Sequence, residues 1–448
     1  MDSPNPEPEV SALPKTRRRA GNRPAEPEPQ VYADQIPMER IDLDAVKVLK
    51  RLSRHGHTAY LVGGGVRDLL LGHEPKDFDI ATSARPNEVR RLFRNCRVIG
   101  RRFRLAHILF AGGKIIEVAT FRRDPSSVGG REAVNVVDAG DTGDTGDEEL
   151  PLSRAEHARR TEADVLIRQD NTFGRPHEDA IRRDFTINGL FFDLERQEVI
   201  DYVGGLEDLR QRVLRTIGPP DLRFREDPIR ILRAIKFSAR LDLGIAPEVY
   251  DAMVDQREEL TRSAPPRVLE EILRLLRGGA AQRSIYLAWD IGVLCLVLPE
   301  LTAHLEDQAE GAEQLWDRLA ALDGLQAEGQ LPGDAVLIAA LLYGPLREAV
   351  EGVRDPGSAF EDFLHDMVER LSLPRRMRDR MRLIFAAQRR LDRGAIGTLR
   401  KRDFFDDAAA LCAIRCRSEG RPLPSAVQAT LEPPAERQRR RRRRARTP

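Results

Sequence analysis

The stretch from Tyr60 to Thr82 limits what this chain can fold into more tightly than any other. It begins with the apolar strand pattern Y-L-V and continues through three consecutive glycines at 63–65 into a short helical pattern. A second strand pattern then carries Asp77 and Asp79. Glycines permit backbone conformations and close approaches that other residues do not. The stretch therefore predicts a compact unit in which a glycine turn lies beside two aspartates.

The glycine turn has the properties of a phosphate-binding loop. Gly63 and Gly64 carry no side chain, so the backbone can approach a phosphate and turn its N–H groups toward it. Arg67 follows one helical turn later, where its guanidinium can reach the same anion. We expect Arg67 and Asp68 to be exposed to this loop. A run of glycines taken alone is usually only a turn, so this interpretation depends on its neighbours.

The D-x-D pattern of Asp77 and Asp79 is the neighbouring feature that supports a phosphate-binding turn. Asp77 and Asp79 are two residues apart in a predicted strand and should share one face, with Phe78 and Ile80 turned to the core. Two adjacent carboxylates repel each other unless a cation lies between them. Hard oxygen ligands of this kind favour Mg²⁺ bound together with substrate phosphates. The combination predicts a metal-dependent site for a nucleotide.

The stretch resembles the signature of class II nucleotidyltransferases of the polymerase-β superfamily, which include bacterial poly(A) polymerases and CCA-adding tRNA nucleotidyltransferases. The resemblance covers about Ala59 to Gly279, and within it Gly100 to Phe110 is closer to the poly(A) polymerase form. It implies an α+β fold, with a polymerase-β-like nucleotidyltransferase head of mixed sheet and helices followed by an all-α C-terminal half. It also implies AMP transfer from ATP to RNA 3′ ends, with two Mg²⁺ ions held by Asp77 and Asp79.

The third acid of such a site has two candidates. Glu117 lies in the strand pattern K-I-I-E-V-A-T-F, on the face opposite Ile116 and Val118, where it is either a solvent-facing edge residue or part of the acidic cluster. In the resembling family the block R-R-D-F-T-I-N contacts ribose and triphosphate, and its aspartate, here Asp184, is counted with the active-site acids. The sequence does not decide between Glu117 and Asp184.

The same block supplies further candidate contacts. The resemblance implies that Arg183 and Asn188 contact the nucleotide phosphates and ribose. We expect a single helix from Glu178 to Leu190, with Ile181 among its buried residues. An ordinary charged helix face is the alternative interpretation.

A second motif, R-E-D-P-I-R-I-L-R, begins at Arg225 and predicts a helix start at Pro228. Asp227 and Arg230 are three residues apart and can stand together on the helix surface. A carboxylate accepts from the amino group of adenine or cytosine while a guanidinium donates to the ring nitrogen, so the pair selects ATP and CTP over GTP and UTP. It does not separate ATP from CTP. Arg233 is a further candidate nucleotide contact, and a structural Asp–Arg pair is the alternative.

Length and composition divide the chain into segments. At 448 residues it exceeds one compact core. Proline- and glutamate-rich, glycine/aspartate-rich and arginine-rich stretches alternate with regular apolar patterns. The expected segments are a disordered N-terminus (1–36), the head (37–215) with a mobile insertion (125–164), a base-recognition neck (216–280), a helical RNA-binding body (281–420) and a disordered tail (421–448).

The overall charge of +1 conceals a block of arginines at 437–446. Arginines at this density should neutralise RNA phosphates in a salt-dependent, sequence-independent way. Scattered cysteines and the absence of an apolar run of ~20 residues predict a cytoplasmic protein without a membrane span, which we expect to be a monomer. The expected partners are RNA 3′ ends, and the candidate RNA-binding residues are Arg439, Arg440, Arg441, Arg442, Arg443 and Arg444.

Three other functions fit parts of the sequence. A CCA-adding enzyme would share every catalytic motif. A non-catalytic RNA-binding protein would use only the helical half and the tail. A superfamily transferase that modifies a small molecule would have no use for the basic tail.

Overall fold

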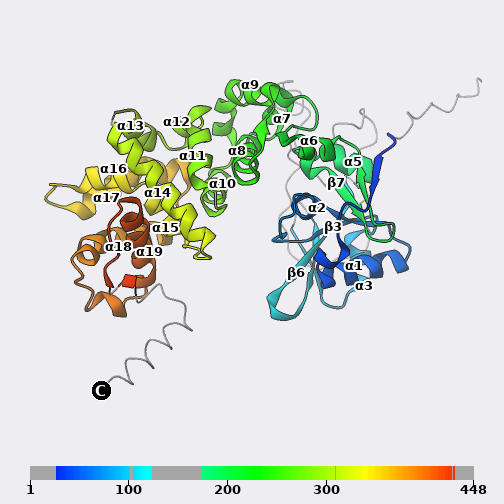
Figure 1. Cartoon of the computed structure of the whole chain (residues 1–448), viewed down its shortest axis with the longest axis horizontal. Helices are drawn as coiled ribbons and strands as arrows, with labels where there is room; N and C mark the ends of the chain where they lie inside the picture. The colour runs from blue at the N-terminus through cyan, green and yellow to red at the C-terminus, as the bar shows by residue number, and fades with distance from the viewer. Residues whose placement is uncertain (1–26, 101–103, 124–172, 308, 426, 429–448) are drawn as a thin grey trace, which may run out of the picture.

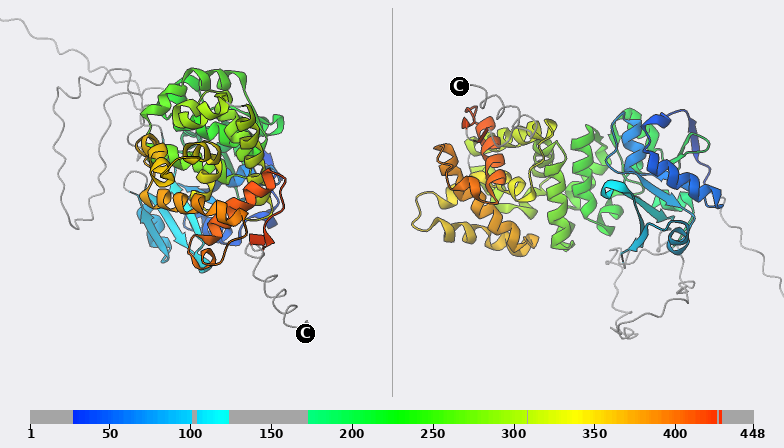
Figure 2. Two further views of the ribbon diagram at one scale, coloured as in Figure 1. Left: turned by 90° about the vertical axis from the view of Figure 1, so that its left-hand side faces the viewer. Right: turned by 90° about the horizontal axis from the view of Figure 1, so that it is seen from below.

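The computed structural model describes residues 27–100, 104–123, 173–307, 309–425 and 427–428. The strands lie in the N-terminal part at one end of an elongated molecule, and helices continue toward the other end (Figure 1). This confirms the α+β class, with a mixed sheet and helices in the head and an all-helical C-terminal half. The right-hand view of Figure 2 shows the same separation from below.

The head is built on one mixed eight-stranded sheet with the strand order β1-β8-β7-β2-β3-β6-β5-β4. Every neighbouring pair is antiparallel except β3 and β6, which are parallel. The strands are β1 (Gln30–Ala33), β2 (Ala59–Val62), β3 (Asp79–Thr82), β4 (Cys96–Ile99), β5 (Leu105–Leu109), β6 (Ile115–Thr120), β7 (Leu190–Asp193) and β8 (Glu198–Asp201).

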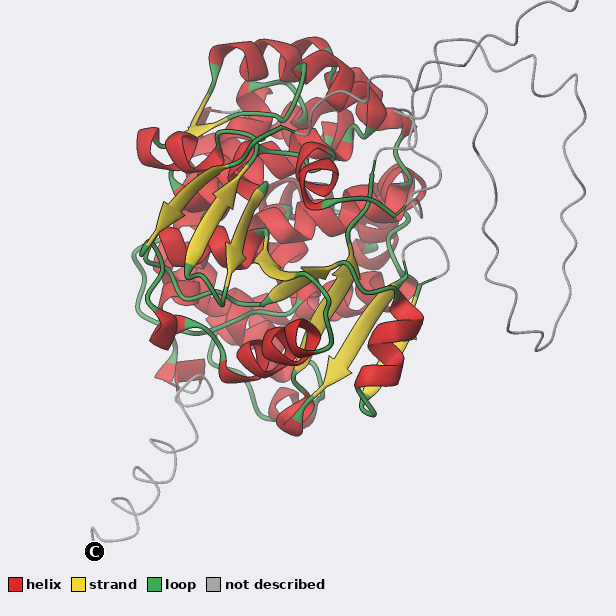
Figure 3. Ribbon diagram, turned by 90° about the vertical axis from the view of Figure 1, so that its right-hand side faces the viewer, coloured by secondary structure: helices red, strands yellow, loops and turns green. Residues whose placement is uncertain are grey.

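Helices cover the sheet on both faces (Figure 3). Leu61 and Ile80 join the main core, which α1 also enters, whereas the adjacent Val62 and Ala81 pack on the other face with Phe191. This alternation is the period of two expected of strands buried on both sides. The short helices of the head are η1 (Met38–Arg40), α1 (Leu43–Arg54), α2 (Gly64–Leu70), α3 (Pro86–Leu92), η2 (Ala111–Gly113), α5 (Pro176–Ile181), η4 (Thr186–Asn188) and α6 (Gly205–Gln211).

The remaining chain is helical apart from a two-residue pairing between β9 (Val213–Leu214) and β10 (Gly244–Ile245). Helix α8 packs against α7, α10 and α11, and α18 and α19 pack against each other farther along. The helices are α7 (Pro220–Glu226), α8 (Ile229–Leu241), α9 (Pro247–Asp255), η5 (Arg257–Arg262), α10 (Pro265–Arg277), α11 (Ala281–Asp290), α12 (Leu294–Val297), α13 (Pro299–Asp307), α14 (Ala309–Ala327), α15 (Asp334–Leu341), α16 (Tyr343–Val350), α17 (Pro356–Leu371), α18 (Arg375–Asp392), η6 (Leu399–Lys401) and α19 (Phe405–Ser418).

Two segments expected to be disordered contain ordered residues. Gln30–Ala33 pairs with β8 as an edge strand, and Tyr32 packs against the core and under the Arg210 guanidinium, 5.4 Å from its ring centroid. Near the other end Val427 is fully buried. Residues 1–26, the predicted insertion at 125–164 and the arginine cluster 439–444 lie outside the described residues.

The single helix expected from Glu178 to Leu190 is wrong. Helix α5 ends at Ile181, whose side chain is 49% exposed rather than buried, and η4 and the strand β7 follow. The run Leu190–Asp193 pairs with β2 and β8. Aromatic residues in this run gain more by filling a sheet between two strands than by extending a short helix.

The helix start predicted at Pro228 is confirmed, because α8 begins at Ile229 directly after Pro228. The two acids that precede Pro228 do not belong to this helix. Glu226 ends α7, Asp227 has extended backbone angles and α8 begins at Ile229. A residue that precedes proline is disfavoured in the helical region, so Pro228 separates two helices here. Helix α1 begins at Leu43, where Asp42 accepts hydrogen bonds from the backbone N–H groups of the first turn.

Candidate active site

The glycine turn connects β2 to α2 and lies where β3 begins. Gly63 has φ of +66°, and a Cβ on it would lie 2.9 Å from Arg183 Nη1. A Cβ on Gly65 would lie 3.3 Å from the Asp77 carbonyl oxygen. The left-handed backbone and the close contact together make a larger residue at position 63 unfavourable. The turn therefore brings Arg183 and the Asp77 backbone against the same loop.

Two of the acids lie on adjacent strands beside this turn, Asp79 on β3 and Glu117 on β6. The expectation that Asp77 and Asp79 lie in one strand is wrong, because Asp77 is exposed and precedes the first residue of β3 by two positions. Asp79, the first residue of β3, is in register with Val62 on β2 and with Glu117 on β6. Burial, the charge of Glu117 and the charge of Asp77 together raise the pKa of Asp79 to about 6, although Arg183 opposes them. Three carboxylates thus act on one another at the end of β3. As expected, Ile80 is turned to the core and Phe78 packs against it.

This cluster suits a hard cation. Its donors are carboxylate oxygens whose mutual repulsion already disfavours the charged form of Asp79, which a divalent ion would relieve. In the described part of the chain the one acid-containing trio whose ligand atoms all lie within 4.8 Å is Asp392, Cys412 and Cys416, so the head carboxylates stand farther apart. A side chain that the sequence did not single out also approaches them: His107 Nε2 lies 3.2 Å from Glu117 Oε1.

Arg67 does not project into the loop. The expectation that Arg67 and Asp68 are exposed is wrong, because the two residues are only 3% and 4% exposed. The Arg67 guanidinium donates to Asp68 Oδ1 at 2.7 and 2.8 Å and to Asn188 Oδ1 at 2.6 Å, and it lies 4.9 Å from the Phe237 ring centroid. Burial and these acceptors give Arg67 a structural position behind the turn.

Asp184 accepts a hydrogen bond from the same Asn188 side chain that contacts Arg67. Its Oδ2 accepts from Arg233 Nε at 2.7 Å, and its Oδ1 accepts from Asn188 Nδ2 at 2.9 Å. Burial alone would raise the pKa of Asp184, but the charge of Arg233 and the hydrogen bonds hold it below its ordinary value. Of the two candidates for the third acid, Glu117 is therefore the direct neighbour of Asp79, whereas Asp184 is ion-paired with α8.

These contacts form a chain that links the head to the first long helix after it. Arg240 Nη2 on α8 lies 3.4 Å from Asp68 Oδ2, which extends the series Asp68, Arg67, Asn188, Asp184 and Arg233 back to α8. Helices α2, η4 and α8 are thus joined by a series of hydrogen bonds and ion pairs, in which the neutral Asn188 amide connects Arg67 to Asp184. The sequence indicated several members of this series but not their mutual contacts.

Arg183 is the arginine whose charge acts on Asp79. Its guanidinium donates to Asp179 Oδ2 at 2.9 Å and to the Asn188 carbonyl oxygen at 3.1 Å, and it lies 5.4 Å from the Phe191 ring centroid. Asp179 was not singled out from the sequence, although its position four residues before Arg183 is the spacing of a helical ion pair. Asp179 orients the guanidinium beside Gly63.

The predicted base-recognition pair is not a pair in this structure. Asp227 Oδ2 lies 3.0 Å from Arg267 Nη2, whereas Arg230 Nη1 lies 3.0 Å from Glu226 Oε2 and donates to the Arg223 carbonyl oxygen. Arg230 is buried and Asp227 is half-buried. Each of the two therefore has its own partner at the junction of α7 and α8.

Comparison with known proteins identifies the family. Residues 59–215 match a family model described as the poly A polymerase head domain, and residues 242–305 match the probable RNA and SrmB-binding site of polymerase A. Poly(A) polymerase I of Salmonella typhimurium is 37% identical over 80% of this chain and 74% of its own length. This chain belongs to the poly(A) polymerase family. It is a nucleotidyltransferase, as the resemblance implied.

CCA-adding enzymes are relatives of this poly(A) polymerase family member as well. The enzyme of Geobacillus stearothermophilus is 34% identical over 62% of this chain and 60% of its own length. The crystal structure of the Bacillus stearothermophilus CCA-adding enzyme in complex with CTP superposes with a TM-score of 0.61 at 26% identity, covering 89% of this chain and 81% of that one. The arrangement of head and helical half is thus common to both branches of the family. In the described part of the chain no helix is long and apolar enough to cross a bilayer.

Proposed function

We propose that this protein is a template-independent poly(A) polymerase that transfers AMP from ATP to an RNA 3′-hydroxyl and releases pyrophosphate. The observation that carries the proposal is the cluster of Asp77, Asp79 and Glu117 beside the glycine turn. The 37% identity with a protein named poly(A) polymerase I supports ATP and RNA as its substrates.

Within this proposal Asp77 and Asp79 are the metal ligands and Glu117 is the third acid. Two Mg²⁺ ions, when bound, would supply the positive charge that stabilises developing negative charge in phosphoryl transfer. The acids of the chain fix where that charge sits, because β3 and β6 hold Asp79 and Glu117 in register. Asp184 acts as a positioning residue that holds Arg233 and Asn188.

The chain's cations and amides would orient the nucleotide. Arg183 lies against Gly63 and its charge acts on Asp79, so it can neutralise phosphate charge there. The Gly63 N–H already donates to the Leu190 carbonyl oxygen, so Gly64 is the glycine proposed to offer its N–H group to a phosphate. Asp227 and Arg230 would recognise the base after exchanging their present partners, Arg267 and Glu226, for the adenine edge. The neighbouring Arg67 and Asn188 support this surface from behind.

RNA 3′ ends are the proposed acceptors, with the tail arginines 439–444 adding sequence-independent affinity. The names of the matched domain and relatives support RNA as the partner. We further propose that the protein acts as a monomer in the cytoplasm.

The test is incubation of the purified protein with unstructured RNA, Mg²⁺ and each nucleoside triphosphate separately, followed by sizing of the RNA. ATP should produce long extensions, and the other three nucleotides should produce few additions. The Asp79→Asn variant under the same conditions controls for contaminating polymerases. Extension by that variant at the wild-type rate would contradict the proposed metal role.

The CCA-adding activity is the second candidate, favoured by the identity and structural similarity to CCA-adding enzymes. A transfer RNA that lacks its 3′ end separates the two activities. Incorporation of two cytidines and one adenosine, with arrest afterwards, would replace the first proposal with the second.

A further inference from the structure

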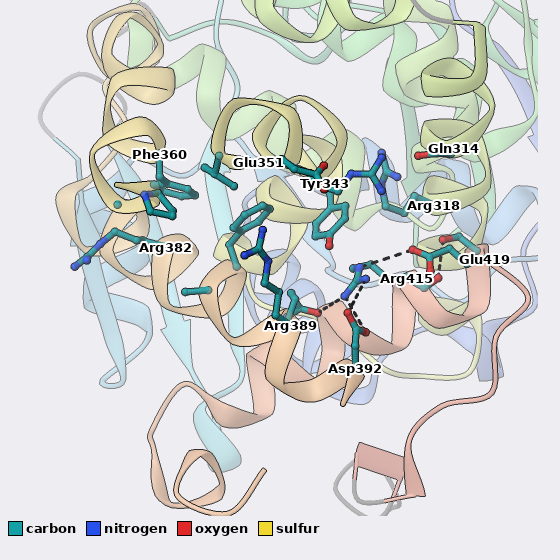
Figure 4. Close-up of a pocket in the computed structure, with 18 of the residues that line it drawn as sticks. Gln314, Arg318, Tyr343, Glu351, Phe360, Arg382, Arg389, Asp392, Arg415 and Glu419 are labelled. Atoms are coloured by element: carbon teal, nitrogen blue, oxygen red, sulfur yellow. Dashed lines mark hydrogen bonds and ion pairs between the residues drawn. The ribbon is translucent and has the colours of Figure 1, made fainter. Parts of the chain in front are cut away.

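A cavity far along the chain from the head lies in the helical half and is lined by residues of α14, α16, α17, α18 and α19 (Figure 4). Its volume is about 760 Å³. Small-molecule sites in proteins usually measure about 300–1,000 Å³, so a ligand of nucleotide size would fit this space. None of the residues predicted to bind the nucleotide lines it.

The interior of this helical cavity contains a buried cation that is not ion-paired with any carboxylate of the described residues, although the charge of Glu419 acts on it. Arg318 on α14 is 4% exposed, and its Nε donates to the Ala340 carbonyl oxygen at 3.1 Å. In the described part of the chain its buried Nη2 has no hydrogen-bond partner, and no carboxylate lies within ion-pairing distance of the group. Burial lowers the pKa of Arg318 to about 10, so it is still protonated at neutral pH. A buried guanidinium without hydrogen-bond partners costs folding free energy, and a bound anion would reduce that cost by accepting hydrogen bonds from it.

Two more cations of the cavity are available at its opening. Arg347 on α16 and Arg389 on α18 line it and are exposed, and within the described ranges neither is ion-paired with a carboxylate. Four exposed carboxylates also line the cavity, those of Asp317, Glu351, Asp392 and Glu419. They would repel an anion that stayed outside, so an anionic group is favoured only where it reaches Arg318.

Aromatic rings form another part of the lining. The ring centroid of Phe385 lies 5.3 Å from that of Tyr343 and 5.9 Å from that of Phe360. The Arg415 guanidinium covers Tyr343 at 4.6 Å and is held by Asp392 at 3.1 Å. Flat apolar surface next to guanidinium groups is what a nucleobase attached to a phosphate requires, because the base stacks and the phosphate is neutralised.

We propose that this cavity is a second nucleotide-binding site, in which Arg318, Arg347 and Arg389 bind phosphate and the half-buried Phe385 contacts the base. Phe360 is only 2% exposed and supports the Phe385 ring from the core. The inference is independent of the proposed catalytic function. The nucleotide can be free in solution or a unit of an RNA strand, because both present the same phosphate and base. Because arginines rather than a metal ion would neutralise the phosphate, binding should not need a divalent ion.

The test is binding of AMP to the full-length protein in EDTA, measured by isothermal titration calorimetry. The Asp227→Asn variant is the background, because it weakens the base contact proposed for the head. We expect saturable binding that becomes at least about tenfold weaker in Arg389→Gln and in Arg318→Gln, from the loss of a charged hydrogen bond. Arg376→Gln, an exposed arginine on α18 outside the cavity, is the matched control and should bind like the parent.

Arg318 is buried, so its variant requires a thermal melt to confirm folding, whereas Arg389 is exposed and its variant should fold normally. Competition distinguishes the two sources of nucleotide. Displacement of AMP by oligo(A) supports an RNA strand as the ligand, and displacement by ATP but not by oligo(A) supports a free nucleotide. Inorganic phosphate binding alone, no saturable AMP binding, or binding unchanged in Arg389→Gln would each overturn the proposal.

Discussion

At the scale of single residues, the carboxylate of Asp79 is placed where it is unfavourable for folding and useful for binding a cation. Its pKa is raised to about 6 by burial and by Glu117 and Asp77. A carboxyl group whose folded-state pKa is raised binds a proton more tightly in the folded state. The metal-free protein should therefore lose stability as pH rises from about 4 to about 6.

Replacing Asp79 by Asn should change stability and activity in opposite directions. In EDTA at pH 7 we expect the variant to be more stable by about 1–3 kcal/mol, because a raised acid pKa destabilises the fold there. Nucleotide incorporation should fall to background. Urea denaturation and an extension assay measure the two effects, with the exposed Asp366→Asn as control. A less stable variant with normal extension would contradict both arguments.

Asp184 should behave in the opposite way. Its lowered pKa means that the ion pair with Arg233 contributes stability above the ordinary carboxyl pKa, and this contribution is lost as pH falls through the folded-state value. Asp184→Asn should lose about 3 kcal/mol at pH 7 and less in acid. Denaturant melts of Asp184→Asn, Arg233→Gln and the double variant measure the coupling. Strictly additive losses would show that the pair does not act as a unit.

At the scale of secondary-structure elements, the sequence pattern predicted those helices and strands whose formation depends mainly on residues that are neighbours in the sequence. The strand, glycine turn, helix and strand from Tyr60 to Thr82 were predicted because each has its own periodicity and turn residues. Strands β1 and β7 were not predicted, because both depend on pairing with β8, which is distant in sequence from β1. The partners of Arg67 and Asp227 were missed for the same reason.

The glycine turn allows a direct test of whether the close approach of Arg183 to Gly63 matters for nucleotide binding. Gly63→Ala would face both a left-handed backbone and a contact of 2.9 Å with Arg183. Gly56→Ala is the matched control, since Gly56 has φ of +81° with nothing within 4 Å of its Cβ position. Both variants should lose about 1–2 kcal/mol of stability. Only Gly63→Ala should raise the KM for ATP, by about tenfold or more, as measured by initial rates of extension. Equal KM values would separate the turn from nucleotide binding.

At the scale of the whole molecule, the active site depends on how the head meets the helices that follow it. The polar series from Asp68 to Arg233 attaches α2 and η4 to α8, so the acids on β3 and the candidate base contacts at the start of α8 are held in one frame. The helical half then provides surface for RNA, for which the second cavity and the basic tail are separate candidates.

Deleting residues 437–448 should separate RNA affinity from catalysis. The block carries eight arginines, and each phosphate contact that it makes should steepen the fall of log affinity with log salt by about 0.7 for a single strand. The truncated protein should therefore bind RNA more weakly at low salt, with a shallower salt dependence, yet extend saturating RNA at the wild-type rate. Filter binding across a salt series and extension at saturating RNA measure these effects, and a tail with the same composition in scrambled order should restore affinity. An unchanged salt slope would show that the tail makes no phosphate contacts, whereas loss of extension at saturation would show that it acts at the catalytic site instead.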